Sequence, residues 1–477
     1  MVRRAAPLLA ALALAGCTVV GPDYHVPDGA LVNAAPAQGS FRSGQAVTVA
    51  EPLPDRWWQL YDDQVLDGLV AQALAANTDL RVVEANLERT LALVDAAGAS
   101  RELQGRLDAD TNYAQRSAEA ELSHVQPPVR QIYNAGIAVS YDLDLFGGLK
   151  RGIEAASADA EAAIAARDLV QVNVAAETAR AYADICNGGF QIQVLERSVA
   201  LQERGLGLTR ILVAHGRAAP YEIDRRRVTL ETSRSRLPRL AARQRNALYR
   251  LTALMGRAPA EADAGLLGCN RPLQVREAIP VGDGQALLKR RPDIRLAERH
   301  LAASTARIGV ATAALYPDIR LGGSLGSTGA TADLLSPLTN RFGIGPSISW
   351  TLNRHAARAR IAAAEAQERA DLATFDGAVL RALREVESAL TSYAAGVDQQ
   401  RSLKAARTEA ALVARRTREL RRGGKIGELP AIEAERDLIA AEQAEAEGQA
   451  AINDDQVTLF LALGGGWSAR APADRMP

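Results

Sequence analysis

Residues 216–235 read GRAAPYEIDRRRVTLETSRS, and residues 424–443 read GKIGELPAIEAERDLIAAEQ. Each stretch places a glycine, a proline and then a hydrophobe followed by an acid at the start of a long helical run. The two acids, Asp224 and Glu433, are 209 residues apart. A unit of about 200 residues is therefore written twice, and each stretch marks the bend of one helical hairpin.

The runs on either side of these bends lack helix breakers. No proline occurs at residues 129–219 or 347–429. In the second copy we predict helices at about residues 355–422 and 429–461, and in the first copy a matching hairpin with a break at residues 187–189. A helix of ~60 residues is ~90 Å long, and such helices pack as coiled coils, where abundant alanine allows close approach.

Each copy also contains a stretch with two-residue periodicity. Residues 136–145 alternate apolar and polar side chains, with a more polar partner strand predicted at 107–117, and residues 319–325 and 342–352 repeat the pattern. Four amphipathic strands cannot close a membrane barrel alone, because barrels begin at about 8 strands. Several chains must share one barrel, and three would give about 12 strands around a water-filled bore.

The N-terminus is a targeting segment. Two arginines and a short apolar run end in Leu14-Ala15-Gly16-Cys17, which resembles a bacterial lipobox. Residues 1–16 are therefore a predicted lipoprotein signal peptide, and Cys17 is the predicted lipidation site; an ordinary cleavage site is the alternative. Thr18, rather than Asp, resembles the sorting signal of outer-membrane lipoproteins. Beyond residue 16 no run of 18 apolar residues occurs.

The remaining boundaries follow from composition. Residues 17–56 are predicted to form a lipid-anchored extended tether, 57–256 repeat 1, 257–284 a linker, 285–466 repeat 2 and 467–477 a C-terminal tail. Asp62 or Asp63 is a predicted helix N-cap, as is the segment beginning at Asn77. Cys186 and Cys269 are either a disulfide or two free thiols.

Several function classes are disfavoured. The 56 basic and 56 acidic residues balance, which argues against a nucleic-acid partner. The five histidines are scattered without metal-ligand spacing, so neither a metal site nor a cofactor is expected. The sequence around Ser324 matches the hydrolase elbow G-x-S-x-G, with His355 downstream, but a polar loop follows it where the elbow requires a helix. No catalytic residue is predicted.

Several segments together resemble the TolC-type outer-membrane efflux factors, in their NodT/OprM-like lipoprotein branch. They cover nearly the whole mature chain and occur in the same order as in that family. They are the lipobox followed by Gly21-Pro-Asp-Tyr24, then Trp57-Trp-Gln-Leu-Tyr-Asp62, Tyr141-Asp-Leu-Asp-Leu-Phe-Gly147, Arg290-Arg-Pro-Asp-Ile294 with Ala297-Glu-Arg299, Ile308-Gly-Val-Ala311 and Tyr316-Pro317.

The resemblance implies a fold, a location and partners. The fold is mainly α with a small transmembrane β part, assembling as a homotrimer into a 12-stranded β-barrel in the outer membrane and an α-barrel in the periplasm. The expected partners are a periplasmic adaptor, a proton-driven inner-membrane pump of the RND type and outer-membrane lipids. The implied function is passive conduction of drugs, dyes and other toxic small molecules to the exterior, without enzymatic activity.

Site residues carry over by position. Glu433 and its first-copy counterpart Asp224 are expected at the periplasmic pore constriction, where ringed carboxylates favour cations. The alternative for Glu433 is an acid that complements the helix dipole. The predicted adaptor-docking tips are Gly216, Arg217, Gly424 and Lys425. Residues 225–227 are expected to form a solvated basic face or, alternatively, an adaptor contact.

The sequence also departs from the family. A second acidic ring residue is replaced by Pro430, the aromatic residue before the tip glycine is Arg421, and the strand-to-helix Phe-Asp-Gly of the second copy is Asn353-Arg354-His355. Two further functions stay open: a channel for a polypeptide secretion system, and a coiled-coil structural lipoprotein without a channel. The second does not account for the four strands.

Overall fold

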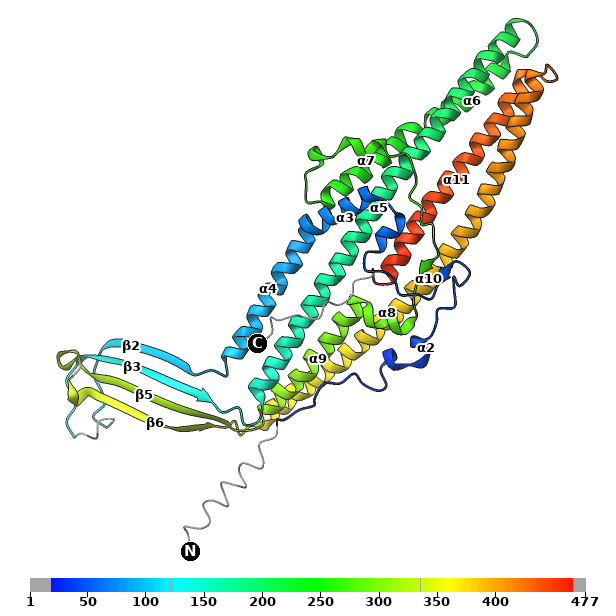
Figure 1. Ribbon diagram of the computed structural model, residues 1–477. Helices are drawn as coiled ribbons and strands as arrows, with labels where there is room; N and C mark the ends of the chain where they lie inside the picture. Colours follow the sequence, from blue (N-terminus) through cyan, green and yellow to red (C-terminus); the bar gives the residue numbers. More distant parts are fainter. Residues whose placement is uncertain (1–18, 120–121, 123, 335, 466–477) are drawn as a thin grey trace. The chain divides into compact units, whose positions relative to one another are not determined.

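The computed structural model describes residues 19–119, 122, 124–334 and 336–465 (Figure 1). The chain divides into two compact units, each built from three stretches. The sheet unit comprises Met1–Pro27, Asn86–Ala163 and Leu296–Phe375. The core unit comprises Asp28–Ala85, Ile164–Arg295 and Asp376–Pro477. The predicted lipidation site Cys17 lies outside the described residues.

The sheet unit contains one four-stranded antiparallel sheet, with strands in the order β2-β3-β5-β6 (Figure 1). The strands are β2 (Gln104–Ala114), β3 (Arg130–Asp142), β5 (Asp318–Ala330) and β6 (Asn340–Ser349). All four predicted strands are confirmed, with ends shifted by up to six residues. In this register the strand hairpin of the first copy pairs with that of the second through β3 and β5.

Two very long helices dominate the rest of the chain, as the absence of prolines predicted. Helix α10 has 69 residues, about 100 Å at 1.5 Å per residue, and α5 has 67. The second-copy helices begin and end within one residue of their predicted bounds. Among the residues that the structure describes, the helices of eight or more residues are α3 (Gln64–Ala76), α4 (Thr78–Ala99), α5 (Gly148–Ala214), α6 (Tyr221–Arg234), α7 (Leu237–Leu254), α9 (Pro292–Ala313), α10 (Arg354–Arg422) and α11 (Glu428–Ala462).

The break predicted at residues 187–189 is wrong, because α5 runs through it without interruption. The glycines there serve close packing. A Cβ at Gly189 would lie 2.0 Å from the carbonyl oxygen of Cys269, and one at Gly188 would lie 3.2 Å from Cβ of Gln244. Each glycine destabilises the helix by about 1 kcal/mol relative to alanine. In return, the segment that follows α7 can contact the backbone of α5.

The returning helix of the first copy is interrupted, unlike its counterpart α11. Helix α6 ends at Arg234 and α7 begins at Leu237, with Pro238 in its first turn. Proline lacks the amide hydrogen that would bond to the carbonyl four residues earlier, and its ring crowds that carbonyl. Ser235 and Arg236 both keep right-handed helical backbone angles, so the interruption is a local kink.

The predicted helix caps are confirmed. One carboxylate oxygen of Asp63 accepts hydrogen bonds from the amides of Val65 and Leu66 at 2.9 and 3.0 Å. The side chain of Asn77 accepts from the amides of Asp79 and Leu80 at 2.9 and 3.2 Å. These bonds satisfy amides that have no partner within the first turn of a helix.

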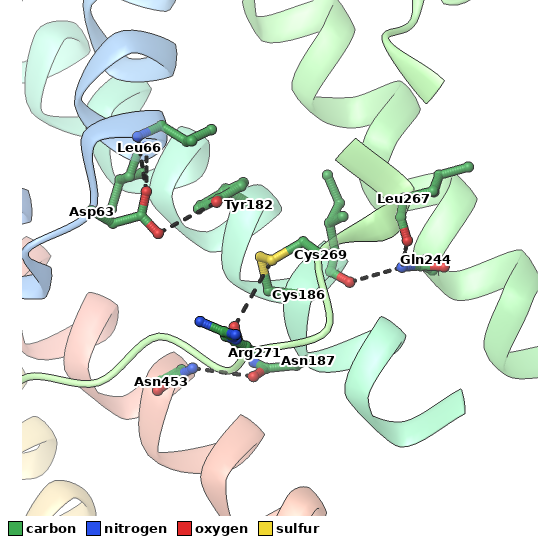
Figure 2. Close-up of a disulfide and its surroundings, with 12 residues drawn as sticks. Asp63, Leu66, Tyr182, Cys186, Asn187, Gln244, Leu267, Cys269, Arg271 and Asn453 are labelled. Carbon is green, nitrogen blue, oxygen red and sulfur yellow. Dashed lines mark hydrogen bonds between the residues drawn. A yellow bond between two sulfur atoms is a disulfide. The ribbon is translucent and has the colours of Figure 1, made fainter. Parts of the chain in front are cut away.

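The core unit is held by an aromatic cluster and a disulfide. Trp57 stacks on Phe460 at 4.4 Å between ring centroids, so the entry to repeat 1 packs on the end of repeat 2. Figure 2 shows Cys186 of α5 joined to Cys269, which resolves the question left open by the sequence. Burial raises the pKa of Tyr182 to about 12, and its hydroxyl donates to Asp63 at 3.4 Å.

The N-terminal segment follows an irregular path with specific contacts. In the core unit its short strand β1 (Thr48–Val49) pairs in parallel with β4 (Ile279–Pro280), and Glu387 accepts the amides of residues 42 and 43 at 2.8 and 3.0 Å. In the sheet unit the buried Arg151 donates to the carbonyls of Val20 and Gly21 and to Asp23. The remaining short elements in the described part of the chain are η2 (Leu31–Asn33), α2 (Ala35–Gln38), η3 (Trp57–Tyr61), η4 (Pro259–Glu261), η5 (Ala264–Gly268), α8 (Gly284–Arg290), η6 (Thr331–Asp333) and η7 (Pro337–Thr339).

Candidate functional site

One face of the four-stranded sheet is apolar and exposed. The registers place Leu107, Ile137, Leu325 and Phe342 in one row across all four strands. Phe342 is 86% exposed and Ile344 85% exposed in the protomer. A water-soluble sheet would bury such a face, so this one requires an apolar environment. Its exposed large apolar residues are Leu107, Tyr113, Ile137, Val139, Tyr141, Leu321, Leu325, Phe342, Ile344 and Ile348.

The length of this face is comparable to the apolar band of an outer-membrane barrel. On β6 the apolar positions run from Phe342 to Ile348, which is about 20 Å along a strand; outer-membrane barrels have an apolar band of about 25 Å flanked by aromatic residues. Tyr141 and Trp350 lie at the end of the band nearer the helices. Tyr133 lies toward the other end, with its hydroxyl within 2.7 Å of the Ser327 hydroxyl.

The opposite face of the sheet is polar. It carries an ion pair between Arg106 and Asp108 at 2.7 Å and another between Arg320 and Asp318 at 2.7 Å. Glycines and serines occupy most of the remaining positions on β5 and β6. An apolar face backed by a hydrated polar face is the pattern of a barrel wall with lipid on one side and water on the other.

The sheet is open at both edges. Within the described residues β2 pairs only with β3, and β6 pairs only with β5. The outer backbone N–H and C=O groups of these two strands therefore have no partner strand. Unpaired backbone groups cost several kcal/mol each in hydrocarbon, so an apolar environment demands that each edge pair with another strand.

The two hairpin bends have the same backbone structure. Gly216 has a φ of 68° and Gly424 a φ of 69°. In each bend the glycine amide donates to the carbonyl three residues earlier, and the amide of the next residue, Arg217 or Lys425, donates to the carbonyl five residues earlier. This is the Schellman arrangement that ends a helix. The four predicted tip residues are all exposed.

The predicted constriction acids lie near these bends, on the returning helices. Glu433 is 51% exposed and Asp224 is 76% exposed at the side chain. Asp224 belongs to the first turn of α6, where an acid complements the helix dipole. The first-turn acid of α11 is Glu428, so the dipole alternative does not explain Glu433, which lies further along the helix. Their role at a constriction stays a prediction.

The sequence did not reveal the partner of Glu433. Arg226 of α6, whose side chain is 17% exposed, approaches the Glu433 carboxylate of α11 at 3.4 Å. The prediction of a solvated basic face is therefore wrong for Arg226, although Arg225 and Arg227 are exposed and pair with acids of their own helix. The only sequence signal for this pairing was helical geometry. Successive residues of a helix are turned by about 100°, so three consecutive arginines cannot all lie on one face.

A second pair fixes the bend of the second copy. Arg421 donates to both carboxylate oxygens of Glu428 at 2.6 and 2.5 Å, across the turn formed by residues 423–427. Arg421 is the residue at which the sequence departs from the family's aromatic. The structure gives this arginine a role in closing the bend, and the two hairpins are joined nearby by Arg204 and Glu435 at 3.4 Å.

The hydrolase elbow considered at Ser324 does not form. Ser324 lies inside β5, paired with Ala138 and Gly343, and not at a sharp turn before a helix. Among the described residues no group of three or more histidines, cysteines or acids is arranged to bind a metal. No helix among the described residues is long and apolar enough to cross a membrane.

The exposed apolar sheet and the long helical hairpins define a subunit of an outer-membrane channel. The outer membrane efflux protein family model matches residues 69–257 and 284–465. The chain belongs to this family, and it is an outer-membrane efflux channel protein. The two matched segments correspond to the two copies, and the unmatched residues 258–283 lie between them.

Known relatives are similar over their whole length. The toluene efflux pump outer membrane protein TtgC of Pseudomonas putida is 28% identical over 481 residues, covering 96% of this chain and 94% of that protein. The cation efflux system protein CusC of Escherichia coli is 27% identical over 476 residues, covering 97% and 98%.

Two solved structures support the same fold. The outer-membrane channel OprN is 32% identical with a TM-score of 0.84, covering 94% of this chain and 99% of that chain. The open state of the MtrE outer membrane channel of Neisseria gonorrhoeae is 25% identical with a TM-score of 0.79, covering 94% and 98%.

Proposed function

We propose that this protein is the trimeric exit channel of a tripartite efflux system, and that it conducts small toxic molecules passively from the periplasm to the exterior. The observation that carries the proposal is the amphipathic sheet with two open edges. Three such sheets, joined edge to edge through β2 and β6, would give a closed wall of 12 strands with lipid outside and water inside.

The proposed partners rest on the sequence and on relatives named as outer membrane proteins of efflux pumps. No nucleotide-binding loop of the Walker type occurs in the sequence, so the energy comes from another component. We assign that role to an inner-membrane pump of the RND type, connected through a periplasmic adaptor that contacts the bends at Gly216, Arg217, Gly424 and Lys425. The protein acts without enzymatic activity and needs no cofactor beyond the covalent lipid on Cys17.

The cargo consists of small solutes. Relatives are named for toluene, for antibiotic and for cation efflux, a range that favours selection by the pump over selection by the channel. The same names favour small solutes over polypeptides, which were the other cargo considered. At the bends, Glu433 and Asp224 form the constriction, and the positive charge of Arg226 partly offsets the negative charge of Glu433 in the protomer.

The proposal is tested by native mass spectrometry of the protein extracted from outer membranes in mild detergent. We expect a trimer carrying one lipid on each Cys17. The Cys17→Ser variant is the matched control, because it removes the acylated thiol and leaves the sheet intact. A wild-type protein that is monomeric, or that is released without detergent, would overturn the proposal.

Conduction needs a separate experiment. A strain lacking the protein should accumulate a fluorescent dye that the complemented strain exports. Complementation by a variant with a charge on the apolar sheet face should fail. Equal dye accumulation in the deletion strain and the complemented strain would contradict the assignment of small-molecule efflux.

A further inference from the structure

The polar face of the sheet contains one arginine that is fixed across several strands. Arg341 of β6 donates through Nε to the Thr328 hydroxyl of β5 at 3.0 Å and through Nη2 to the Asn134 side-chain oxygen of β3 at 2.7 Å. Thr328 also donates to Asn134 at 2.9 Å, and Asn134 donates to Asp110 of β2 at 2.9 Å. One hydrogen-bonded chain thus links all four strands.

Two glycines make room for this arginine. A Cβ at Gly326 would lie 3.2 Å from Cζ of Arg341, and one at Gly136 would lie 3.2 Å from its Nη2. Both distances are tighter than ordinary contacts of a Cβ. The guanidinium therefore lies over these two glycines, and side chains at these positions would displace it. Its two hydrogen bonds and this position over the glycines restrict the rotamers of a long, flexible side chain.

The charge of Arg341 is not neutralised by a neighbouring carboxylate. Two other arginines on this face are each paired with an acid: Arg106 with Asp108, and Arg320 with Asp318. Within the described part of the chain no ion pair involves Arg341, whose acceptors are a hydroxyl and an amide oxygen. The nearest acid in the chain of bonds is Asp110, which is reached only through Asn134.

We infer that Arg341 is a fixed cationic lining residue of the channel, and that it favours passage of solutes carrying a carboxylate, sulfonate or phosphate over passage of cationic solutes. The inference rests on the proposed function, because it requires that the polar face line a water-filled lumen. Guanidinium groups bind such oxyanions through paired N–H donors. In a trimer the residue would occur three times around the lumen.

The test uses a cysteine reporter. The chain has three cysteines, of which Cys186 and Cys269 form the disulfide and Cys17 is acylated under the proposed function. The variant Ser324→Cys places a thiol on the polar face of β5, diagonal to Arg341. The trimer in vesicles is treated with an anionic sulfonate and with a cationic trimethylammonium methanethiosulfonate reagent, and the ratio of their reaction rates reports the local potential.

The expected effect is set by distance and salt. Diagonal neighbours lie about 7 Å apart, so Arg341→Gln should lower the ratio of anionic to cationic rates about twofold at 0.15 M salt and about fivefold at 0.01 M. Arg341→Lys should keep the ratio. Arg320→Gln is the matched control at 0.15 M salt, because it lies about 13 Å along β5 from the reporter, beyond the screening length of about 8 Å. At 0.01 M the screening length is about 30 Å, so the effect of Arg320→Gln should there be smaller than that of Arg341→Gln but not zero.

The outcomes separate the two proposals. A reporter that reacts with neither reagent would show that the polar face does not line an aqueous lumen, and the proposed function would fail. A reporter that reacts with both reagents at a ratio unchanged by Arg341→Gln at low salt would overturn the role of Arg341 while leaving the channel intact. The parent protein without Ser324→Cys must stay unreactive, which confirms that no other thiol contributes.

Discussion

The disulfide between Cys186 and Cys269 gives the sharpest stability prediction. It joins the middle of α5 to the segment that follows α7, across a sequence separation of 83 residues (Figure 2). We expect Cys269→Ala to destabilise the core unit. This residue is half-buried, whereas Cys186 is fully buried in the core, so removal of the Cys269 sulfur breaks the bond with little loss of packing.

The magnitude follows from loop entropy. Closing a loop of this length in the unfolded chain is worth about 4.5 kcal/mol in the chain-entropy model. For a cooperative unit of roughly 300 residues, this corresponds to a decrease in Tm of about 7 °C. Cys186→Ala breaks the same bond and also empties a buried site, so its Tm should fall further, by the equivalent of about 1–2 kcal/mol.

The assay is thermal unfolding of the purified protein in detergent, followed by circular dichroism at 222 nm. The wild type, Cys269→Ala, Cys186→Ala and the double variant are compared at one scan rate, because unfolding of a membrane protein is governed partly by kinetics. The double variant should match Cys186→Ala, since one bond is lost in both. A Tm of Cys269→Ala within 1 °C of the wild type would refute the reasoning.

Three further changes test the close helix contact, the membrane face and the bends. Gly189→Ala should destabilise by at least about 2 kcal/mol in denaturant titrations because its Cβ meets a carbonyl oxygen at 2.0 Å, whereas Gly207→Ala on the same helix, with nothing within 4 Å, should be neutral or slightly stabilising. Ile344→Lys should cost about 2–4 kcal/mol per chain at the membrane midplane and reduce the amount of trimer in isolated outer membranes, while Ser347→Lys on the polar face should not. Arg226→Gln should free its carboxylate partner and raise the preference for K⁺ over Cl⁻ in bilayer recordings, an effect that high salt removes; an unchanged reversal potential at low salt would contradict it.

The sequence predicted the long helices well because their evidence is local. Helix α10 begins one residue before the predicted start and ends where expected. Whether a proline-free run is helical depends mainly on residues within one turn of each other, which the sequence shows directly. The same local reasoning failed at Gly188 and Gly189. Their presence reflects the approach of Cys269 and Gln244, which are distant in sequence, so the glycines indicated a break that tertiary contact removes.

The sequence predicted the two faces of the sheet but not which side chains contact one another. The alternation of the strands predicted an apolar and a polar face, and both exist. The sequence did not show that Arg341 would reach Asn134, because that contact depends on the register of three strands. Likewise, only the rotation of α6 against α11 decides that Arg226, and not its neighbours, faces Glu433.

The duplication preserves the length of the helical arm that returns from each bend. Gly216 and Gly424 are separated by 208 residues, and so are Gly256 and Gly464, the glycines that end the returning helices with the same hydrogen-bond pattern. The returning arm therefore has the same length in both copies, although one copy is kinked at Pro238 and the other is not. One inserted residue would shift a helix by 1.5 Å and turn it by 100°. The contact between Arg226 and Glu433 joins the two arms near their bends, so an insertion in one arm alone would move one partner away from the other.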